Sequence, residues 1–515
     1  MTEIESKHGI VSRQPYEMYM SFVDLQNFQR MLPEDKKDMI TADYDTLTAT
    51  VQGFHIGVKV HQRVPYSRIE LVDFDAPFAF HIVLHFEPAK EDPYKTDFWI
   101  SVEADLNLMM KMMLSGKIQE ALDKVVDGLV DASNGKMPEG FEALLTASVG
   151  AERAATVLEA LQAAPSVSIR LNPSKLPTCP FPDAMPVAWS PYGYLLKERP
   201  VFTLDPLFHA GAYYVQDTSA MFVGHVFRQL PLQEGATVLD LCAAPGGKTT
   251  DLAASLRERL GERFTLLSNE VMRARYGVLR SNVETWGDAR VGTVSRDPSA
   301  FGANALFDII VADVPCSGEG MFRKDAQAVA EWSPQTVEFC AARSRRILRD
   351  IWPTLKPGGY LLYSTCTFNH LENDDTVAWA AEELGAAIVP VLADASPAVP
   401  TRHGYALLPG LVPGEGQYAA VLRKHGEPEP LRTADPFVLF RAERLSPPEA
   451  LPLWDVDRQT ALQYLHGDAL VLSPEAPIGP ITICYQGLPL GPAKNLGKRC
   501  NNLYPKAKRI RMDIR

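Results

Sequence analysis

The chain lacks any apolar run approaching the ~20 residues that a membrane-spanning helix needs. Its first residues, MTEIESKHGI, also lack the basic and apolar pattern of a secretory signal. Cysteine is scarce, and its odd number, scattered positions and lack of a CxxC pair argue against a disulfide framework and a zinc site. The seven cysteines are residues 179, 242, 316, 340, 366, 484 and 500. We therefore expect a cytoplasmic protein with reduced thiols, no metal and no membrane partner.

The chain also has no overall excess of positive charge, since its net charge is −12. This value by itself disfavours a nucleic-acid partner. The charge is uneven, however: residues 1–136 carry a net −8, whereas residues 494–515 carry a net +7. Since the charge of the binding domain is the relevant quantity, the basic C-terminal stretch favours nucleic acid over a solvated tail. Trp332 and Tyr504 are candidates for stacking on bases, the alternative being burial. A second basic stretch contains Arg343, Arg345, Arg346 and Arg349.

Residues 1–136 are typical of an α+β layer. Apolar and polar residues alternate in four runs, which predicts strands, and an amphipathic helix of residues 107–135 follows. The runs are residues 45–64, 67–74, 78–88 and 96–106. This pattern resembles the START-like (polyketide cyclase/SRPBCC) helix-grip family. Such folds often enclose an apolar cavity, so the resemblance implies a possible hydrophobic ligand.

The remaining chain predicts three further regions. SNGKMPEG, at residues 133–140, looks like a join, and we hypothesise that two genes were fused at Met137; the alternative is an ordinary linker that contains a methionine. From about residue 232 strands and helices alternate, which predicts βαβ units and a mostly parallel sheet. Proline and charge interrupt this rhythm at residues 425–435. The expected domains are residues 1–136, 137–231, 232–425 and 436–515.

One turn of the predicted sheet is suited to a ligand. VLDLCAAPGGKTT, at residues 238–250, reads as a strand, a turn with two glycines and a helix. The glycines allow a ligand to approach the backbone, and the helix start offers free N–H groups. Glu270 ends the next strand, where an acid accepts hydrogen bonds from ribose hydroxyls, and Asp297 is a candidate partner of an adenine amine. The alternatives are a tight turn, a helix-start acid and an Asp-Pro turn.

Two thiols follow two strands of the same sheet. In FDIIVADVPCSG, Pro315 holds Cys316 in a turn after a strand that ends at Asp313, and GGYLLYSTCT repeats this arrangement with Cys366. A single buried cysteine is usually structural. Two thiols and a carboxyl group beside a ligand loop instead indicate covalent catalysis, in which one thiol attacks, another assists release and the acid activates the substrate. The chemistry alone does not choose the attacking thiol.

Several motifs carry a resemblance to a known family. LDLCAAPGGKTT, ADVPCSGEGMFRKD and LLYSTCTFNHLEN resemble S-adenosylmethionine-dependent RNA (cytosine-5) methyltransferases of the bacterial rRNA type. Upstream, IRLNPSK (169–175) and FHAGAYYVQDTSAM (208–221) match further motifs, so the likeness covers about 137–425. GLPLGPAKNLGKRCNNLYP resembles the family's PUA-like RNA-binding module. The resemblance implies a Rossmann-like methyltransferase core, between a helix-grip domain and a small C-terminal module.

The resemblance also implies a role for each site residue. Cys366 becomes the nucleophile, Cys316 the group for product release, and Asp313 the acid that activates the base. Lys248 orients Asp313 or the cofactor, the alternative being a surface lysine. S-adenosyl-L-methionine is the implied cofactor and rRNA the implied substrate; tRNA and a non-catalytic ribosome-assembly role are the alternatives. The implied cofactor contacts are Cys242, Ala243, Ala244, Pro245, Gly246, Gly247, Lys248, Glu270, Asp297 and Asp313.

Overall fold

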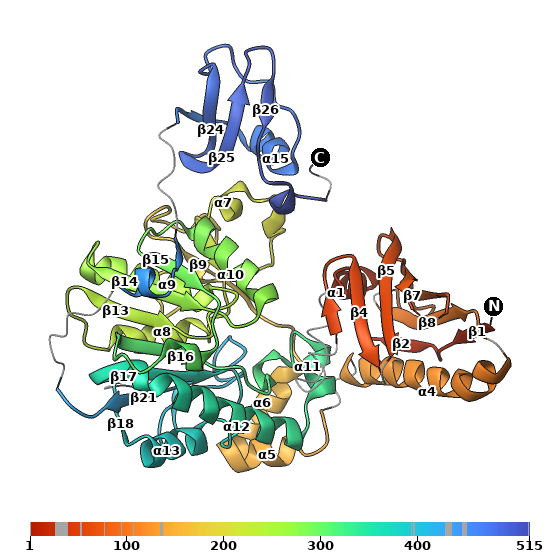
Figure 1. Ribbon diagram of the computed structural model, residues 1–515, viewed down its shortest axis with the longest axis horizontal. Coiled ribbons are helices and arrows are strands. Elements are labelled where there is room, and N and C mark those ends of the chain that lie inside the picture. The colour runs from red at the N-terminus through yellow and green to blue at the C-terminus, as the bar shows by residue number, and fades with distance from the viewer. Residues whose placement is uncertain are drawn as a thin grey trace. The chain divides into compact units, whose positions relative to one another are not determined.

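The computed structural model describes most of the chain, and the described residues form two compact units (Figure 1). The first unit comprises Met1–Leu144 and Ser317–Thr336, and the second comprises Leu145–Cys316 and Val337–Arg515. Every helix of the described residues is too short or too polar to cross a bilayer. The described residues are 2–25, 40–51, 54–76, 78–93, 95–106, 108–133, 137–392, 394, 397–427, 435–444, 451–512 and 514.

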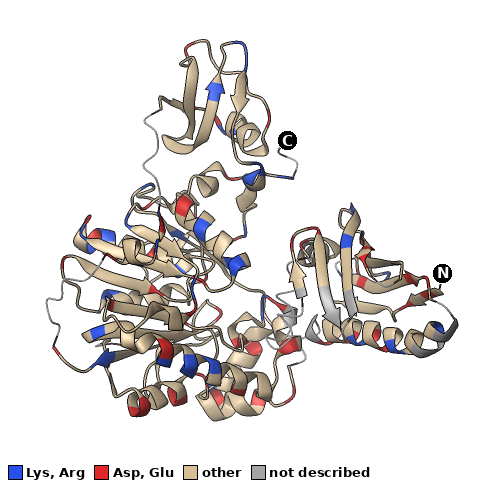
Figure 2. Ribbon diagram, viewed as in Figure 1, with Lys and Arg blue, Asp and Glu red and all other residues tan. Residues whose placement is uncertain are grey.

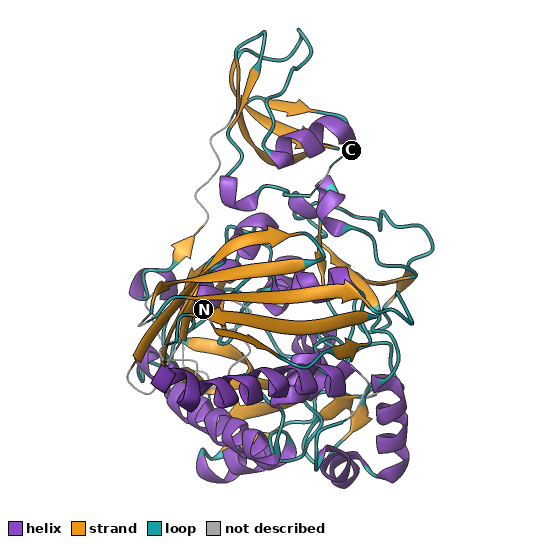
Figure 3. Cartoon of the chain, turned by 90° about the vertical axis from the view of Figure 1, so that its right-hand side faces the viewer, coloured by secondary structure: helices purple, strands orange, loops and turns teal. Residues whose placement is uncertain are grey.

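The first unit is built on an antiparallel sheet of order β1-β8-β7-β6-β5-β4-β3, with β2 also paired to β8 (Figure 3). Two helices, α1 (Pro15–Phe22) and α4 (Leu108–Ser133), pack on it. Each predicted run is a strand or a pair of strands, and the predicted long helix is α4. The strands are β1 (Thr2–Glu5), β2 (Gly9–Val11), β3 (Ile40–Ala42), β4 (Thr46–Val51), β5 (Phe54–Val64), β6 (Arg68–Asp75), β7 (Phe80–Pro88) and β8 (Thr96–Ala104).

The alternating pattern of these strands builds the core of this unit. Buried and partly exposed residues alternate along β8, as expected of a sheet with one covered face. On the covered face Phe86 and Phe98 are fully buried, and Phe22 from α1 packs on both at 5.7 and 5.6 Å between ring centroids. A Cβ on Gly9 would overlap Val126 of α4, so glycine permits the close approach of β2 to this helix.

A short segment after Cys316 belongs to the same unit. It contains η3 (Glu319–Met321) and α11 (Ala326–Glu331). Trp332 follows, donates through Nε1 to Glu319 Oε1 at 3.0 Å, and packs edge-on against Phe141. Trp332 is only 4% exposed, so of the two alternatives, base stacking and burial, the structure shows burial.

The second unit is organised around one large sheet of order β19-β20-β21-β17-β16-β13-β14-β15-β22. The strands from β15 to β17 in this order are parallel, as predicted, whereas β20, β21 and β22 pair antiparallel. The strands are β13 (Ala236–Asp240), β14 (Phe264–Asn269), β15 (Val291–Val294), β16 (Phe307–Asp313), β17 (Leu355–Thr365), β18 (Ala386–Ile388), β19 (Val399–Pro400), β20 (Tyr405–Leu407), β21 (Gln417–Lys424) and β22 (Glu443–Arg444).

The order of the parallel strands fixes where a ligand can bind. The chain runs from β13 outward through β14 to β15, and then returns to place β16 and β17 on the other side of β13. The carboxyl ends of β13 and β16 therefore form a switch point, where ligands bind in open α/β sheets. The associated helices and 3₁₀ turns are α8 (Met221–Arg228), α9 (Gly247–Leu260), α10 (Arg273–Trp286), η2 (Pro298–Phe301), α12 (Pro334–Ile351), η4 (Trp352–Thr354) and α13 (Asp374–Glu383).

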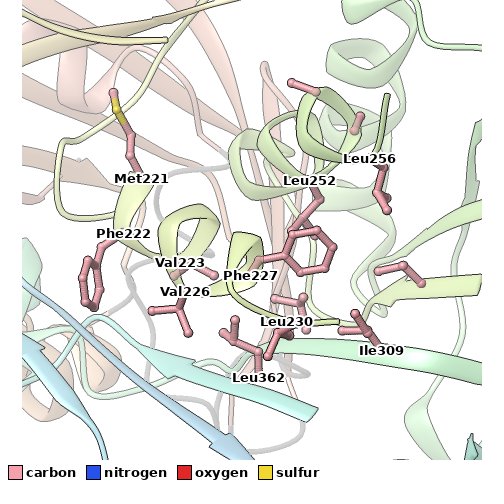
Figure 4. Packing of buried hydrophobic residues seen from close by; sticks show 14 of the residues in the cluster. Met221, Phe222, Val223, Val226, Phe227, Leu230, Leu252, Leu256, Ile309 and Leu362 are labelled. Carbon is pink, nitrogen blue, oxygen red and sulfur yellow. The ribbon is translucent and has the colours of Figure 1, made fainter. Parts of the chain in front are cut away.

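One face of this sheet is closed by an apolar cluster (Figure 4). Phe227 from α8 and Leu256 from α9 lie in this cluster with Ile309 of β16 and Leu362 of β17, and all four are at most 1% exposed. Because both faces of the parallel strands are covered, β13 and β16 read as continuous apolar runs rather than alternating ones.

A smaller antiparallel sheet of order β10-β11-β9-β12 precedes the large one and was not predicted. Its residue Arg170, on β9, is fully buried, donates to Gln216 Oε1 at 2.7 Å and to the Gly247 carbonyl oxygen at 3.0 Å, and lies over Trp286. Burial disfavours the cation and lowers the pKa of Arg170 to about 10. The elements are α5 (Phe141–Val149), α6 (Ala151–Leu161), β9 (Val167–Leu171), β10 (Met185–Pro186), β11 (Gly193–Leu196), η1 (Phe202–Leu204), α7 (Pro206–His209) and β12 (Tyr213–Val215).

The C-terminal module is a sheet of order β23-β24-β25-β26 with helix α15. Its structural start is later than the predicted residue 436, because Phe437 and Phe440 pack in the core of the large sheet and β22 pairs with β15. Tyr504 is 6% exposed and packs on Tyr464, so of the two alternatives, base stacking and burial, the structure shows burial. Helix α14 (Pro436–Leu439) packs with the large sheet. The elements of the module are β23 (Leu453–Asp455), α15 (Arg458–His466), β24 (Gly479–Tyr485), β25 (Leu488–Asn495), β26 (Cys500–Asn502) and η5 (Lys506–Lys508).

The core cluster yields a stability prediction. Phe227→Ala removes a fully buried ring, so we expect the free energy of unfolding of the second unit to fall by ~3–5 kcal/mol. Phe339→Ala makes the same change at a side chain that is 49% exposed, and we expect a much smaller loss. Urea denaturation followed by tryptophan fluorescence measures both, and equal losses would contradict the assignment of this core.

Candidate active site

The two thiols lie together because β16 and β17 are parallel neighbours. Asp313, the last residue of β16, pairs in register with Ser364 of β17, and the Val314 N–H donates to the Ser364 carbonyl oxygen at 3.0 Å. The two strands therefore end at the same edge of the sheet, and the turns that follow them meet. The Sγ atoms of Cys316 and Cys366 are 3.3 Å apart.

The proximity of the thiols sets their protonation. The hydrogen bond to Cys366, together with burial, raises the pKa of Cys316 well above its ordinary value. Cys316 therefore stays a neutral thiol near neutral pH, and its S–H can donate to the Cys366 sulfur.

A cation and a carboxylate complete this centre. Lys248 Nζ lies 2.8 Å from Asp313 Oδ2, and Gln417 Nε2 donates to Asp313 Oδ1 at 3.0 Å. Burial acts to lower the pKa of Lys248, but the attraction of Asp313, and after it of Cys366, raises it overall. Lys248 is therefore a charged ammonium group near Cys366.

The glycine turn between β13 and α9 has the shape of a binding loop. Gly246 has a φ of +109°, which favours glycine, and the Ala243 N–H donates to the Asn269 carbonyl oxygen at 2.8 Å. Arg275 Nη2 donates to the Ala244 carbonyl oxygen at 2.7 Å, and Asn282 Nδ2 donates to that of Pro245 at 2.8 Å. The predicted contacts from Cys242 to Lys248 thus form one turn that leads to the Asp313 pair.

Three acids surround this turn. Burial raises the pKa of Cys242, and Glu270, Asp240 and Asp313 raise it further. Burial also raises the pKa of Asp240 to about 7. Asp240 Oδ1 and Glu270 Oε2 are buried without a hydrogen-bond partner. These two acceptors and the acidic surroundings fit a positively charged ligand with hydroxyl or ammonium donors. Sequence reasoning missed Asp240, although its position at the end of β13 beside the glycine turn was a usable signal.

Asp297 lies further out than the other predicted residues. Its side chain is 43% exposed and accepts hydrogen bonds from the Ser299 N–H and hydroxyl at 3.0 and 2.6 Å. These bonds lower the pKa of Asp297, with a smaller contribution from Arg346. The preceding residue, Arg296, is bound to Asn269 at the end of β14, so Asp297 stands at the rim of the cofactor-side strands.

The predicted basic surfaces are only partly free. Arg346 pairs with Asp297 and Asp350, Arg349 lies over Trp379, and Arg343 lies over Phe339. Figure 2 shows further lysine and arginine residues on the C-terminal module. No group of three or more His, Cys, Asp or Glu side chains in the described ranges has a metal-binding arrangement.

A parallel sheet with a glycine turn at its switch point, and a pair of thiols beside it, forms an open α/β domain with a candidate binding site. Comparison with known families agrees. Residues 228–423 match the family model described as 16S rRNA methyltransferase RsmB/F. Residues 137–218 match the N-terminal domain of 16S rRNA methyltransferase RsmF, and residues 453–510 match the methyltransferase RsmF PUA domain. Residues 228–423 are thus similar to the RsmB/F methyltransferases, and residues 453–510 are similar to the PUA domain of RsmF.

Curated relatives have similar sequences. Ribosomal RNA small subunit methyltransferase F of Pectobacterium carotovorum subsp. carotovorum (strain PC1) is 33% identical over 303 residues, which are 56% of this chain and 60% of the relative. The protein of the same name from Klebsiella pneumoniae (strain 342) is 34% identical over 316 residues, or 57% of this chain and 65% of the relative. The chain thus spans less than two thirds of the length of these relatives.

A solved structure shares the fold. The crystal structure of PH0851 aligns with a TM-score of 0.50 and 20% sequence identity, over 61% of this chain and 75% of that chain. At this identity the likeness concerns the fold alone.

The sulfur–sulfur distance gives a prediction. Because the two Sγ atoms are 3.3 Å apart, we expect diamide to join Cys316 and Cys366 in a disulfide, with two hydrogen atoms lost and dithiothreitol reversing the reaction. Peptide mass spectrometry after digestion detects the cross-linked peptide. Cys340 is buried and serves as an internal control, which should stay unoxidised. A cross-link from either thiol to Cys340 in its place would contradict the geometry.

Proposed function

We propose that this protein transfers a methyl group from S-adenosylmethionine to carbon-5 of a cytosine in rRNA through a covalent cysteine adduct. The observation that carries the proposal is the Cys316–Cys366 pair, 3.3 Å apart, beside the ion pair of Lys248 and Asp313. The 16S rRNA methyltransferase family and the ribosomal RNA methyltransferases among its relatives support rRNA as the substrate.

The chemistry explains why a thiol is needed. Carbon-5 of cytosine is a poor nucleophile, and a thiolate that bonds to carbon-6 makes the electron pair of the 5,6 double bond available at carbon-5. Carbon-5 then bonds to the methyl group. Loss of the carbon-5 proton to a base and breakage of the carbon–sulfur bond restore the double bond and release the thiolate.

The two thiols then have separate roles. Cys366 is the nucleophile, as the resemblance to RNA (cytosine-5) methyltransferases implies, and the Cys316 sulfur lies 3.3 Å from it. Cys316 is next to the adduct and assists the release of the product. Asp313 activates the base by holding a proton or a hydrogen bond at ring nitrogen N3. Lys248, paired with Asp313, orients this carboxyl group.

The cofactor site lies on the other side of Asp313. S-adenosylmethionine, when bound, supplies a methyl group on a sulfonium. The turn of Cys242, Ala243, Ala244, Pro245, Gly246 and Gly247 offers its backbone to the ligand. Glu270 accepts hydrogen bonds from the ribose hydroxyls through Oε2, which has no hydrogen-bond partner and lies 3.6 Å from Arg275 Nη1, and Asp297 holds the adenine amine from the rim. The charge of Asp240 and Asp313 favours the positive donor.

The RNA surface belongs to the C-terminal PUA domain. Its basic stretch, residues 494–515, carries a net charge of +7 and neutralises phosphates. Helix α12 carries a second group of arginines, of which the exposed Arg346 and Arg349 are further candidates for phosphate contacts.

Residues 1–136 form a START-like helix-grip domain that a fusion at Met137 joined to the methyltransferase. Its antiparallel sheet and one long helix support this proposal, as does the family match that begins at residue 137. Residues 134–136 lie outside the described residues. The close packing of Phe22, Phe86 and Phe98 favours a filled core over a hydrophobic-ligand cavity.

Substitution of the thiols tests the mechanism. In cells that lack the gene, we expect Cys366→Ala to abolish methylation, whereas Cys316→Ala forms the adduct and fails to release it. Bisulfite sequencing of rRNA and tRNA detects the methylated cytosine, and denaturing gels detect protein that stays bound to RNA. Cys484→Ala, a buried thiol of the C-terminal module, is the control for loss of a cysteine.

The outcomes separate the alternatives. An active Cys366→Ala variant would refute the assignment of Cys366 as the nucleophile. Methylation found only in tRNA would show that the substrate is tRNA rather than rRNA. No methylation by the wild-type protein would favour a non-catalytic role in ribosome assembly.

The raised pKa of Asp240 predicts that cofactor affinity depends on pH. Below its pKa of about 7 the carboxyl group is neutral, and above it the carboxylate attracts the positive cofactor. We therefore expect S-adenosylmethionine to bind more tightly at about pH 8 than at about pH 6, with release of a proton on binding. Calorimetric titration measures the change.

Two variants define this prediction further. Asp240→Asn should flatten the pH dependence, whereas Asp183→Asn, in an exposed turn of the upstream sheet, should leave it intact. An unchanged dependence in Asp240→Asn would assign the titration to another group.

A further inference from the structure

We propose that Gln417 is a positioning residue that fixes the carboxyl group of Asp313 in the orientation needed for catalysis. The inference rests on the proposed function and adds a residue from outside the motifs of the family resemblance. The juxtaposition that carries it is the hydrogen bond of 3.0 Å between Gln417 Nε2 and Asp313 Oδ1.

The sheet places Gln417 at the end of β17. Gln417 begins β21, which runs antiparallel to β17, and the next residue, Tyr418, pairs with Thr365 directly before Cys366. The Gln417 side chain is nearly fully buried and donates from the same nitrogen to Ser364 Oγ. It therefore reaches Asp313 across β17 from a strand that carries none of the predicted site residues.

The backbone before Gln417 is held as tightly as its side chain. The Gly416 N–H donates to Ser219 Oγ at 3.1 Å, and the Glu415 N–H donates to Asp217 Oδ1 at 3.2 Å. A Cβ on Gly414 would overlap the Ser219 hydroxyl. These contacts fix the start of β21. They also assign a structural role to the upstream motif of residues 208–221, which contains both acceptors.

The Asp313 carboxyl group needs a second hydrogen-bond partner, because a single contact does not fix the orientation of its plane. The terminal torsion of aspartate is broad, so the group can rotate about its contact with Lys248. With Lys248 on Oδ2 and Gln417 on Oδ1, both oxygens are restrained. The amide of Gln417 restrains the second oxygen without placing another charge beside Asp313.

The test compares variants by single-turnover methylation of unmethylated rRNA with S-adenosylmethionine. Gln417→Met keeps the length of the side chain and removes the donor, so we expect the rate at saturation to fall about 10- to 100-fold. The KM for rRNA and the Kd for the cofactor should change little. Gln417→His keeps an N–H donor and should retain most of the rate. Gln233→Met, at an exposed position before β13, is the matched control.

A double-mutant cycle separates positioning from a merely structural role. If Gln417 acts through Asp313, Gln417→Met should add no further loss in an Asp313→Asn background. Additive losses, or a wild-type rate in Gln417→Met, would overturn the inference. Should Gln417→Met fail to fold, Gln417→Glu replaces it, and equal rates of Gln417→Glu and Gln417→His would overturn the inference as well. An inactive wild-type protein would instead contradict the proposed function.

Discussion

The parallel pairing of β16 with β17 is the constraint on which the site depends. Both strands end at the same edge, and the register that sets Asp313 beside Ser364 brings two turns into contact. A slip by one residue would turn alternate side chains to the opposite face and separate the thiols. The apolar residues on both faces, such as Ile309 on one and Ile310 on the other, hold this register because each is at most 1% exposed.

Lys248 and Asp313 form an ion pair in a largely buried place. Burying a lysine side chain is costly unless an acid lies close, and the Asp313 carboxylate lies 2.8 Å from Lys248 Nζ. The same ammonium group attracts Cys366, whose sulfur lies 3.3 Å from that of Cys316. Lys248 thus interacts both with the carboxyl group and with a thiol of the site. Asp240 and Glu270 add two further acids, each with one buried oxygen that has no hydrogen-bond partner.

Local patterns of the sequence predict the parts of this site that lie within one strand and its turn. The runs before Cys316 and Cys366, the glycine turn and the long helix α4 have strong local signals. Gln417 has no such local signal, because its role depends on the antiparallel pairing of β21 with β17, which is distant in sequence. The predicted start of the C-terminal module at residue 436 is too early for a similar reason. The sequence does not show that Phe437 packs in the core of the large sheet. Trp332 and Tyr504 could not be assigned without knowledge of their burial.

Arg170 ties the upstream antiparallel sheet to the first turn of α9 through a carbonyl oxygen of the glycine motif. Removing that sheet would remove Arg170 from its contacts with Trp286 and Gln216 and would expose the amino end of α9 to water. The catalytic sheet is therefore not a self-sufficient module. Any recombination that exchanges this domain between proteins has to carry residues 167–215 with it.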